Sequence, residues 1–105
     1  MSDNENNTTG LSDAERERLA ILAEECAEII HIVSKIQRHG FESCDPGDRL
    51  RVTNRDLLDG ELQDLSWIVG MMVKEKDIPT RGMTDMELKR IQRRKEKFLH
   101  FQPNA

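Results

Sequence analysis

The stretch that decides the fold is residues 19–36, which read LAILAEECAEIIHIVSKI. Its apolar residues recur at steps of three and four, which places them along one side of a helix that turns about 100° per residue. This stripe consists of Leu22, Cys26, Ile29, Val33 and Ile36. We therefore expect an amphipathic helix with the stripe as its core face and Cys26 as a small buried hydrophobe.

The sequence marks both ends of this helix. The segment Ser12–Glu15 is a capping box, in which the Ser12 hydroxyl accepts a hydrogen bond from the Glu15 amide and the Glu15 carboxylate accepts one from the Ser12 amide. Gly40 is typical of the residue that follows a helix C-terminus. The first helix is predicted to run from Ser12 to residue 38 or 39.

Two further helices follow from the remaining patterns. The Asp45–Asp48 turn signal makes residues 41–52 a loop, with room for a short extra helix. A second helix is expected from Asn54 to about Lys76, and a third from the capping box at Thr84 to about Phe101. The apolar residues expected to face inward are Leu57, Leu58, Leu62, Leu65, Ile68, Val69 and Met72 on the second helix and Met86, Leu88, Ile91, Phe98 and Phe101 on the third.

Length and composition indicate one small all-α domain. The chain has 105 residues, of which 36% are apolar and only 4% aromatic, so its core should be thin. Gly60 and Gly70 each cost roughly 1 kcal/mol in a helix interior, which suggests that another backbone approaches closely there. We expect a disordered tail over residues 1–10 and, over 11–105, an antiparallel bundle of three main helices completed by assembly into a homodimer or homotetramer.

Charge and hydropathy exclude several classes of protein. The net charge of −4 argues against a dedicated nucleic-acid binder. No apolar run reaches the length of a membrane span, and the N-terminus lacks the pattern of a signal peptide. We therefore expect a cytoplasmic protein whose two cysteines, Cys26 and Cys44, are reduced thiols.

Two acidic pairs carry the chemical interest. Glu25 and Glu28 lie three residues apart on the first helix, as do Glu61 and Asp64 on the second, so each pair projects from one side of its helix. An isolated pair of this kind is more often a solvated helix surface. Both pairs border the apolar stripes, however, so antiparallel packing would bring four carboxylates together. Such a cluster repels itself without a cation and offers the oxygen ligands that Mg²⁺ prefers.

The pattern E-E-x-x-E followed by E-x-x-D resembles the signature of the all-α nucleoside triphosphate pyrophosphohydrolases, a group that includes MazG-like proteins, dimeric dUTPases and phosphoribosyl-ATP pyrophosphohydrolase. The two halves of the pattern are residues 22–29 and 61–65. Further similarities are Lys35, Arg38–Gly40, Thr53–Asn54 and Lys97–Phe98.

The chain also departs from this pattern. The spacer at positions 29–60 is longer than is usual in the group, with the excess in the Cys44–Pro46 loop. His39 stands where an aromatic residue is common, and Lys95 where the last motif often has Asn. These differences bear on which base is accepted more than on the metal chemistry.

The resemblance implies hydrolysis of a nucleoside triphosphate to a monophosphate and pyrophosphate, with Mg²⁺ as cofactor and Mn²⁺ as its substitute. The metal ligands it implies are Glu25, Glu28, Glu61 and Asp64, and either Glu24 or Glu25 would accept the proton of the attacking water. Lys35, Arg38 and Lys97 are the candidate phosphate ligands. Basic residues at helix C-termini are also favoured by the helix dipole, and the basic run Lys89–Lys97 is better read as a solvated surface.

Three alternatives stay open from the residues alone. Glu28–His31 is an E-x-x-H, the step used in di-iron bundles, although the chain offers only one; we read His31 as a partly buried or rim residue. A catalytically silent helical module that associates through the same stripes is the stronger alternative. The basic third helix leaves a nucleic-acid-associated regulator as a minor one.

Overall fold

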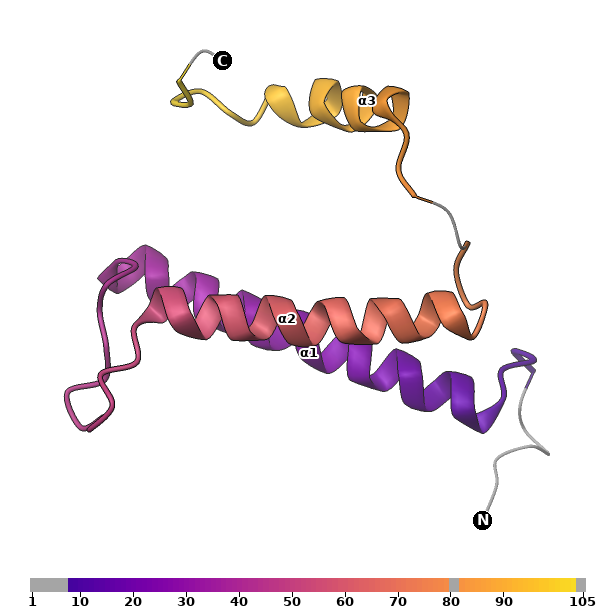
Figure 1. Ribbon diagram of the computed structural model, residues 1–105, viewed down its shortest axis with the longest axis horizontal. Helices are drawn as coiled ribbons and strands as arrows, with labels where there is room; N and C mark the ends of the chain where they lie inside the picture. Colours follow the sequence, from indigo (N-terminus) through magenta and orange to yellow (C-terminus); the bar gives the residue numbers. More distant parts are fainter. Residues whose placement is uncertain (1–7, 80–81, 104–105) are drawn as a thin grey trace.

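The computed structural model describes residues 8–79 and 82–103, and this part of the chain forms three α-helices, α1 (Asp13–His39), α2 (Asn54–Lys74) and α3 (Asp85–Glu96). The first two lie side by side and antiparallel, joined by the loop over residues 40–53 (Figure 1). The described residues contain no strand, only an isolated bridge between Cys44 and Thr53. The all-α prediction is confirmed. The tail predicted over residues 1–10 lies, in its first seven residues, outside the described part.

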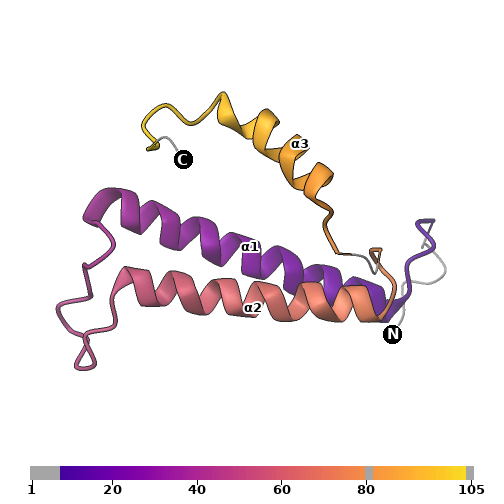
Figure 2. The ribbon, with the colours of Figure 1, turned by 45° about the horizontal axis from the view of Figure 1, so that its top comes forward.

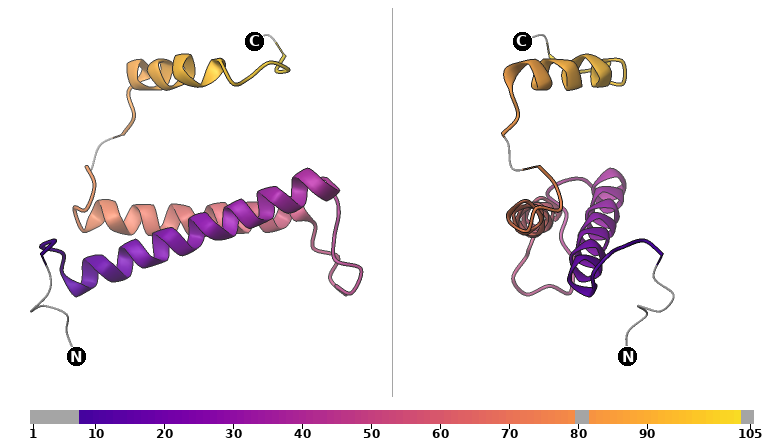
Figure 3. Two further views of the ribbon diagram at one scale, coloured as in Figure 1. Left: turned by 180° about the vertical axis from the view of Figure 1, so that it is seen from behind. Right: turned by 90° about the vertical axis from the view of Figure 1, so that its right-hand side faces the viewer.

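The third helix stands apart from the other two. Among the described helices only α1 and α2 contact each other, and Figures 2 and 3 show α3 separated from the pair in every view. Its residues Met86, Phe98 and Phe101 were expected to face inward but are 81%, 68% and 94% exposed. That expectation is wrong within the single chain, because α3 has no helix to pack against.

Local capping explains where the helices begin. The Ser12 hydroxyl accepts from the Glu15 amide at 3.1 Å, and the Glu15 carboxylate accepts from the Ser12 amide at 2.7 Å. The same reciprocal pair joins Thr84 and Glu87 at the start of α3. Each pair satisfies two amides that have no partner inside the helix, so these predicted starts are confirmed.

The C-terminal ends of α2 and α3 come earlier than predicted. α2 ends at Lys74, because Lys76 adopts a left-handed backbone with φ of 66° that cannot continue a right-handed helix. α3 ends at Glu96 instead of about Phe101. A short helix without tertiary contacts gains little from one more turn.

The core is a single line of contact between α1 and α2. Its fully or nearly fully buried apolar residues are Ile32 on α1 and Ile68 and Met72 on α2, which are 7%, 0% and 4% exposed. In sequence, Arg18, Glu25 and Ile32 recur every seven residues along this line on α1, as do Asn54, Glu61 and Ile68 on α2. A seven-residue recurrence is the spacing at which one side of a helix keeps facing a neighbour.

The predicted core stripe is only partly correct. Cys26 and Val33 are exposed, the latter by 39%, whereas Leu22, Ile29 and Ile36 are half-buried. On α2 the residues Leu57, Leu62 and Val69, also predicted to face inward, are 36%, 45% and 37% exposed. Leu58 and Leu65 are half-buried as expected. The apolar surface of each helix is wider than one partner helix can cover, so its outer margin stays in solvent.

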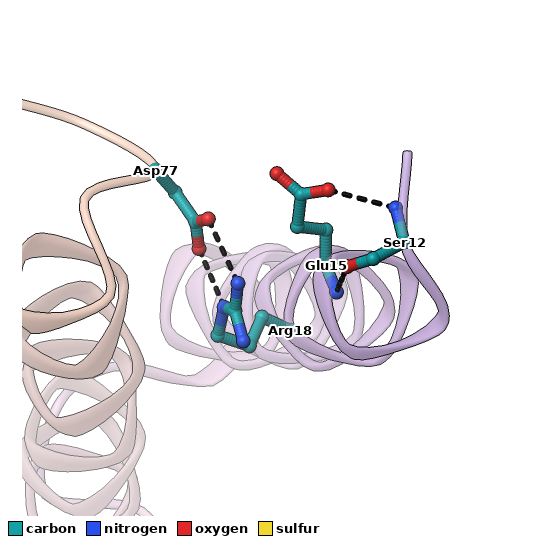
Figure 4. A network of polar contacts seen from close by, with 4 residues as sticks. All are labelled: Ser12, Glu15, Arg18 and Asp77. Atoms are coloured by element: carbon teal, nitrogen blue, oxygen red, sulfur yellow. Dashed lines mark hydrogen bonds and ion pairs between the residues drawn. The ribbon is translucent and has the colours of Figure 1, made fainter. Parts of the chain in front are cut away.

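Polar contacts hold both ends of the α1–α2 pair. Near the start of α1, Arg18 donates from Nε and Nη2 to the two carboxylate oxygens of Asp77, at 2.6 and 2.9 Å (Figure 4). At the other end, the buried Asn54 side chain donates to the Gly40 carbonyl at 3.1 Å. Neither contact was predicted from the sequence.

The connecting loop folds as its turn signal predicts. The Asp45 side chain accepts from the Gly47 amide, and the Asp45 carbonyl accepts from the Asp48 amide, both at 2.9 Å. Residues 41–52 form turns and no extra helix.

The two helical glycines are not close-approach sites. A Cβ added at Gly60 or Gly70 would meet nothing within 4 Å, so the interpretation that another backbone passes close to them is wrong within this chain. In the described part of the chain, no helix is both long and apolar enough to cross a membrane.

Candidate metal centre

Three glutamates meet in the middle of the α1–α2 contact line. Glu25 and Glu28 are one turn apart on α1, and Glu61 projects from α2. One carboxylate oxygen from each lies within 4.8 Å of the others, and all three side chains are half-buried. The helices thus place the acidic residues inside the contact, where the flanking apolar residues reduce their access to water.

Two of the carboxylate oxygens are shielded from water and have no hydrogen-bond donor in its place in the described part of the chain. Glu25 Oε2 and Glu61 Oε2 are shielded from solvent, and neither accepts a hydrogen bond from the described residues. Withdrawing a charged oxygen from water without compensation is costly. A bound cation, a shared proton or an ordered water would satisfy such oxygens.

The surroundings raise the pKa of two of these carboxyl groups. Burial is the main cause of the raised pKa of Glu25, and the negative charges of Glu28, Asp64 and Glu24 add to it, while a hydrogen bond with Glu61 acts in the opposite direction. The pKa of Glu28 is raised first by its hydrogen bond and charge interaction with Glu61, then by burial and by Asp64. Full ionisation of the cluster is therefore unfavourable unless positive charge is supplied.

The donor set suits a hard divalent cation. Carboxylate oxygens are the ligands that Mg²⁺ and Mn²⁺ prefer, whereas imidazole and thiolate favour softer ions. Among the described residues the candidate metal group contains glutamates only. His31, expected to be a partly buried or rim residue, is exposed and does not belong to it. Among the described residues, this group therefore lacks the histidine ligands of a di-iron site.

Asp64 and Glu24 lie beside the cluster. Asp64 follows Glu61 by one helical turn and is exposed; its charge acts on both Glu25 and Glu28, so it is near them, although it is not one of the three carboxylates that meet. Glu24 is exposed and contributes to the raised pKa of Glu25.

The candidate phosphate ligands have different surroundings. Lys35 is half-buried and lies one turn beyond Ile32, whereas Arg38 is exposed. The Lys97 ammonium lies 5.3 Å from the centre of the Phe98 ring, at the end of α3. Because α3 contacts neither α1 nor α2, Lys97 is not brought to the acidic cluster in this chain.

A shallow pocket of about 420 Å³ lies where α1 meets the connecting loop. Its lining consists of Lys35, His39, Ser43, Cys44, Asp45, Pro46 and Asn54. This pocket was not predicted from the sequence. The i, i+4 spacing of Lys35 and His39 does place both residues on one side of α1. The other wall of the pocket comes from the loop, whose path across this helix end depends on contacts between residues distant in sequence.

Comparison of the chain with protein families, with curated proteins and with solved structures finds no match.

Proposed function

We propose that the chain is a Mg²⁺-dependent nucleotide pyrophosphohydrolase, related to the all-α group that its acidic pattern resembles, and that it converts a nucleoside triphosphate and water into a nucleoside monophosphate and pyrophosphate. The observation that supports this most directly is the meeting of Glu25, Glu28 and Glu61 within 4.8 Å. Two of their oxygens are shielded and without a hydrogen-bond partner among the described residues. A purely structural contact line would gain stability from apolar residues at these positions.

The three glutamates, with Asp64 turning inward, would hold the ion. Bound Mg²⁺ would neutralise charge on the triphosphate oxygens and make a nearby water easier to deprotonate. The described residues supply the oxygen ligands that this ion takes in proteins. Mn²⁺ accepts the same donors and is expected to substitute.

The chain's own carboxylates would accept the proton of the attacking water. The water oxygen forms a bond to the α-phosphorus, the bond from that phosphorus to the pyrophosphate oxygen breaks, and the water proton passes to Glu24 or Glu25. Glu25 is suited to this role because its carboxylate lies in the cluster, within 4.8 Å of the carboxylate oxygens of Glu28 and Glu61. Glu24 is suited because it is exposed beside the cluster.

Basic residues on the same helix would orient the substrate. Lys35 lies two turns beyond Glu28, which keeps its ammonium on nearly the same side of α1. An ammonium there can pair with phosphate oxygens. Arg38 lies close to that side and is exposed.

The test is a panel of canonical and modified nucleoside triphosphates incubated with Mg²⁺, with pyrophosphate and orthophosphate measured separately. Pyrophosphate release that depends on Mg²⁺ and is lost in Glu61→Gln is expected. The matched control is Asp59→Asn, which also removes one charge from α2, at an exposed position. Failure to hydrolyse any nucleotide would exclude the enzyme, and release of orthophosphate alone would move the cut to another bond.

A helical interaction module is the second candidate. It is favoured by the exposed apolar side chains along α1 and α2, among them Ile30 at 70% and Trp67 at 61%. For such a module, Glu61→Gln should leave association unchanged and there should be no hydrolysis to lose. Measuring nucleotide hydrolysis and self-association for the wild type and Glu61→Gln therefore separates the two candidates.

A further inference from the structure

A groove lies between the start of α1 and the end of α2. It encloses about 460 Å³, and Ile21, Trp67 and Met71 contribute its large apolar side chains. Trp67 is the only tryptophan of the chain and is 61% exposed. The charged residues of the lining are Glu17 and Arg18. The groove therefore presents an accessible indole among mostly apolar side chains.

The groove continues the side of the helix pair on which the acidic residues lie. On α1, Ile21 lies seven residues before Glu28, a spacing that keeps both on nearly the same side of the helix. On α2, Trp67 lies three residues after Asp64, on the same side of that helix. The charge of Asp64 acts on Glu25 and Glu28. Because the two helices are antiparallel, both steps lead in the same direction away from the acidic cluster.

A positive charge lies in the opposite direction from the cluster. Lys35 follows Glu28 by seven residues, as Glu28 follows Ile21, so these three residues form one row along α1. The order along the row is apolar groove, acidic cluster and ammonium group. A nucleoside triphosphate carries its parts in the matching order, which is base, α-phosphate and terminal phosphates.

We propose that the groove receives the base of the substrate and that Trp67 stacks on this base without selecting among bases. The inference rests on the proposed hydrolase activity, because that activity puts the α-phosphate at the acidic cluster. It adds the residue that holds the other end of the nucleotide and the breadth of substrates that are accepted.

The distance between the cluster and the indole suits this placement. Trp67 lies six residues beyond Glu61, a rise of about 9 Å at 1.5 Å per residue. The Cα–Cβ bonds of a helix tilt towards its N-terminus, so the Trp67 side chain starts out in the direction of Glu61. The ribose of a nucleotide held at the cluster would extend over the remaining distance and bring the base beside the indole.

The groove has few groups that could distinguish one base from another. Every base has a flat π-face that can stack on an indole. Arg18 already donates from Nε and Nη2 to Asp77. Glu17 is exposed, so water competes for its carboxylate. We therefore expect purine and pyrimidine triphosphates to be accepted alike.

The fluorescence of Trp67 tests the stacking directly, because this residue is the only tryptophan and the chain has no tyrosine. The full chain with Mg²⁺ is titrated with the α,β-methylene analogues of adenosine and cytidine triphosphate, in which the bond to be cut is blocked, and with inorganic tripolyphosphate. Both analogues should quench the emission and tripolyphosphate should not. Free N-acetyltryptophanamide corrects for absorption by the bases. Equal quenching by tripolyphosphate would overturn the proposal.

Acrylamide quenching of the free chain tests whether the groove is open. Trp67 should be accessible to acrylamide, as its exposure requires. An emission that acrylamide fails to quench would mean that a protein surface covers the groove, and would overturn the proposal. Both fluorescence measurements use the wild type, so they decide even if a variant fails to fold.

Steady-state kinetics test the same contact during turnover. Trp67→Ala should raise KM for each nucleotide roughly tenfold or more, as expected for the loss of one base–aromatic stack, and Trp67→Phe should recover most of the loss. The matched control Ile30→Ala truncates another apolar side chain, 70% exposed on α1, and should leave KM unchanged. The values of kcat/KM for the four bases should differ by less than about 200-fold, the range that apolar contacts give.

Failure of this inference is distinguishable from failure of the proposed function. Hydrolysis with an unchanged KM in Trp67→Ala would overturn the inference and leave the hydrolase. A preference for one base of more than about a thousandfold, which requires hydrogen bonds to the base, would do the same. Quenching by the analogues without hydrolysis of any triphosphate would support the groove and exclude the hydrolase. Neither quenching nor hydrolysis would overturn both.

Discussion

A carboxylate oxygen of Glu25 on α1 lies within 4.8 Å of a carboxylate oxygen of Glu61 on α2, and each residue has an Oε2 atom that is shielded and unpartnered among the described residues. The two acidic groups occupy the contact line between Ile32 and Arg18 on α1 and between Ile68 and Asn54 on α2. Positions that would stabilise the pair most with apolar side chains therefore carry negative charge. If the cluster binds an ion as proposed, stability and metal affinity are two measurements of the same site.

The metal-free protein should lose stability as the pH rises above 4.5. The folded chain raises the pKa values of Glu25 and Glu28 above their ordinary value of 4.5. Their stabilising effect is therefore complete below that pH and is lost as the pH rises through the raised values. Thermal unfolding followed by circular dichroism in EDTA from pH 4 to 8 measures this, and excess Mg²⁺ should reduce the decline.

Asp77 contributes in a separate window. Its hydrogen bonds and charge interaction with Arg18 lower the pKa of Asp77 below 3.8, so that contribution is present at higher pH and is lost only as the pH falls below 3.8. A melting temperature in EDTA that climbed steadily from pH 4.5 to 8 would contradict the prediction for the glutamates.

Glu61→Gln should have opposite effects with and without the ion. Removing one charge from the cluster relieves repulsion, so the metal-free variant is expected to melt at a higher temperature than the wild type. Its stabilisation by Mg²⁺ should be nearly absent, whereas a bound ion at one hundred times its dissociation constant stabilises the wild type by about 2.7 kcal/mol. Isothermal titration and thermal shift measure the two effects. Asp59→Asn serves as control, and an equal Mg²⁺ response in both variants would exclude the site.

Ile68→Ala should be strongly destabilising. Ile68 is fully buried at the centre of the contact line, and truncating such a residue costs about 2–5 kcal/mol through lost burial and the cavity that remains. Leu50→Ala is the comparison, because Leu50 is 83% exposed and its truncation should leave the free energy of unfolding almost unchanged. Urea denaturation of both variants gives the difference. Similar losses would mean that the α1–α2 contact differs from the one described.

Arg18→Gln and Asp77→Asn should each destabilise the chain, and the double variant should lose less than the sum. Arg18 donates two hydrogen bonds to Asp77, which lies 59 residues further along the chain. Both side chains are largely shielded from solvent. Removing one partner leaves the other without its bonds, so the second change adds little. A double-mutant cycle by chemical denaturation measures this coupling; strictly additive losses would show that the contact does not form in solution.

Two glycines should respond to alanine in opposite ways. Gly70→Ala is expected to stabilise α2 by about 1 kcal/mol, because alanine is the better helix former and the added Cβ meets nothing within 4 Å. Gly40→Ala should destabilise, since Gly40 ends α1 with φ of +89°, a conformation that is strained for alanine. Melting temperatures compare the two; a destabilising Gly70→Ala would indicate that another surface packs against α2 at that point.

Features encoded by neighbouring residues were predictable. The starts of α1 and α3 were correct because Ser12 with Glu15, and Thr84 with Glu87, satisfy their amides within one turn. The turn at Asp45 depends on bonds to the next three residues. The grouping of Glu25 with Glu28 followed from helical spacing. Glu61 lies beside them because the loop over residues 40–53 returns α2 antiparallel to α1.

Features that depend on distant surfaces were not predictable. Cys26 and Val33 have the spacing of core residues, but their burial depends on what covers the second side of α1. Arg18 and Asp77 carry no mutual signal across their separation in the chain. The shielding of Glu25 Oε2 and Glu61 Oε2 likewise comes from the exact approach of two helices, which no local pattern specifies.

The polar ties at the two ends of the α1–α2 pair have a mechanical consequence for its charged centre. The Arg18–Asp77 contact at one end and the Asn54–Gly40 contact at the other hold the two helices together on either side of the glutamate cluster. In the proposed metal site, the helices would then keep their spacing while the glutamates reorient around an arriving ion, so that binding and release would need only side-chain motion. If one of these contacts were removed, the repulsion among the three glutamates would separate the helices from the end that had lost its contact.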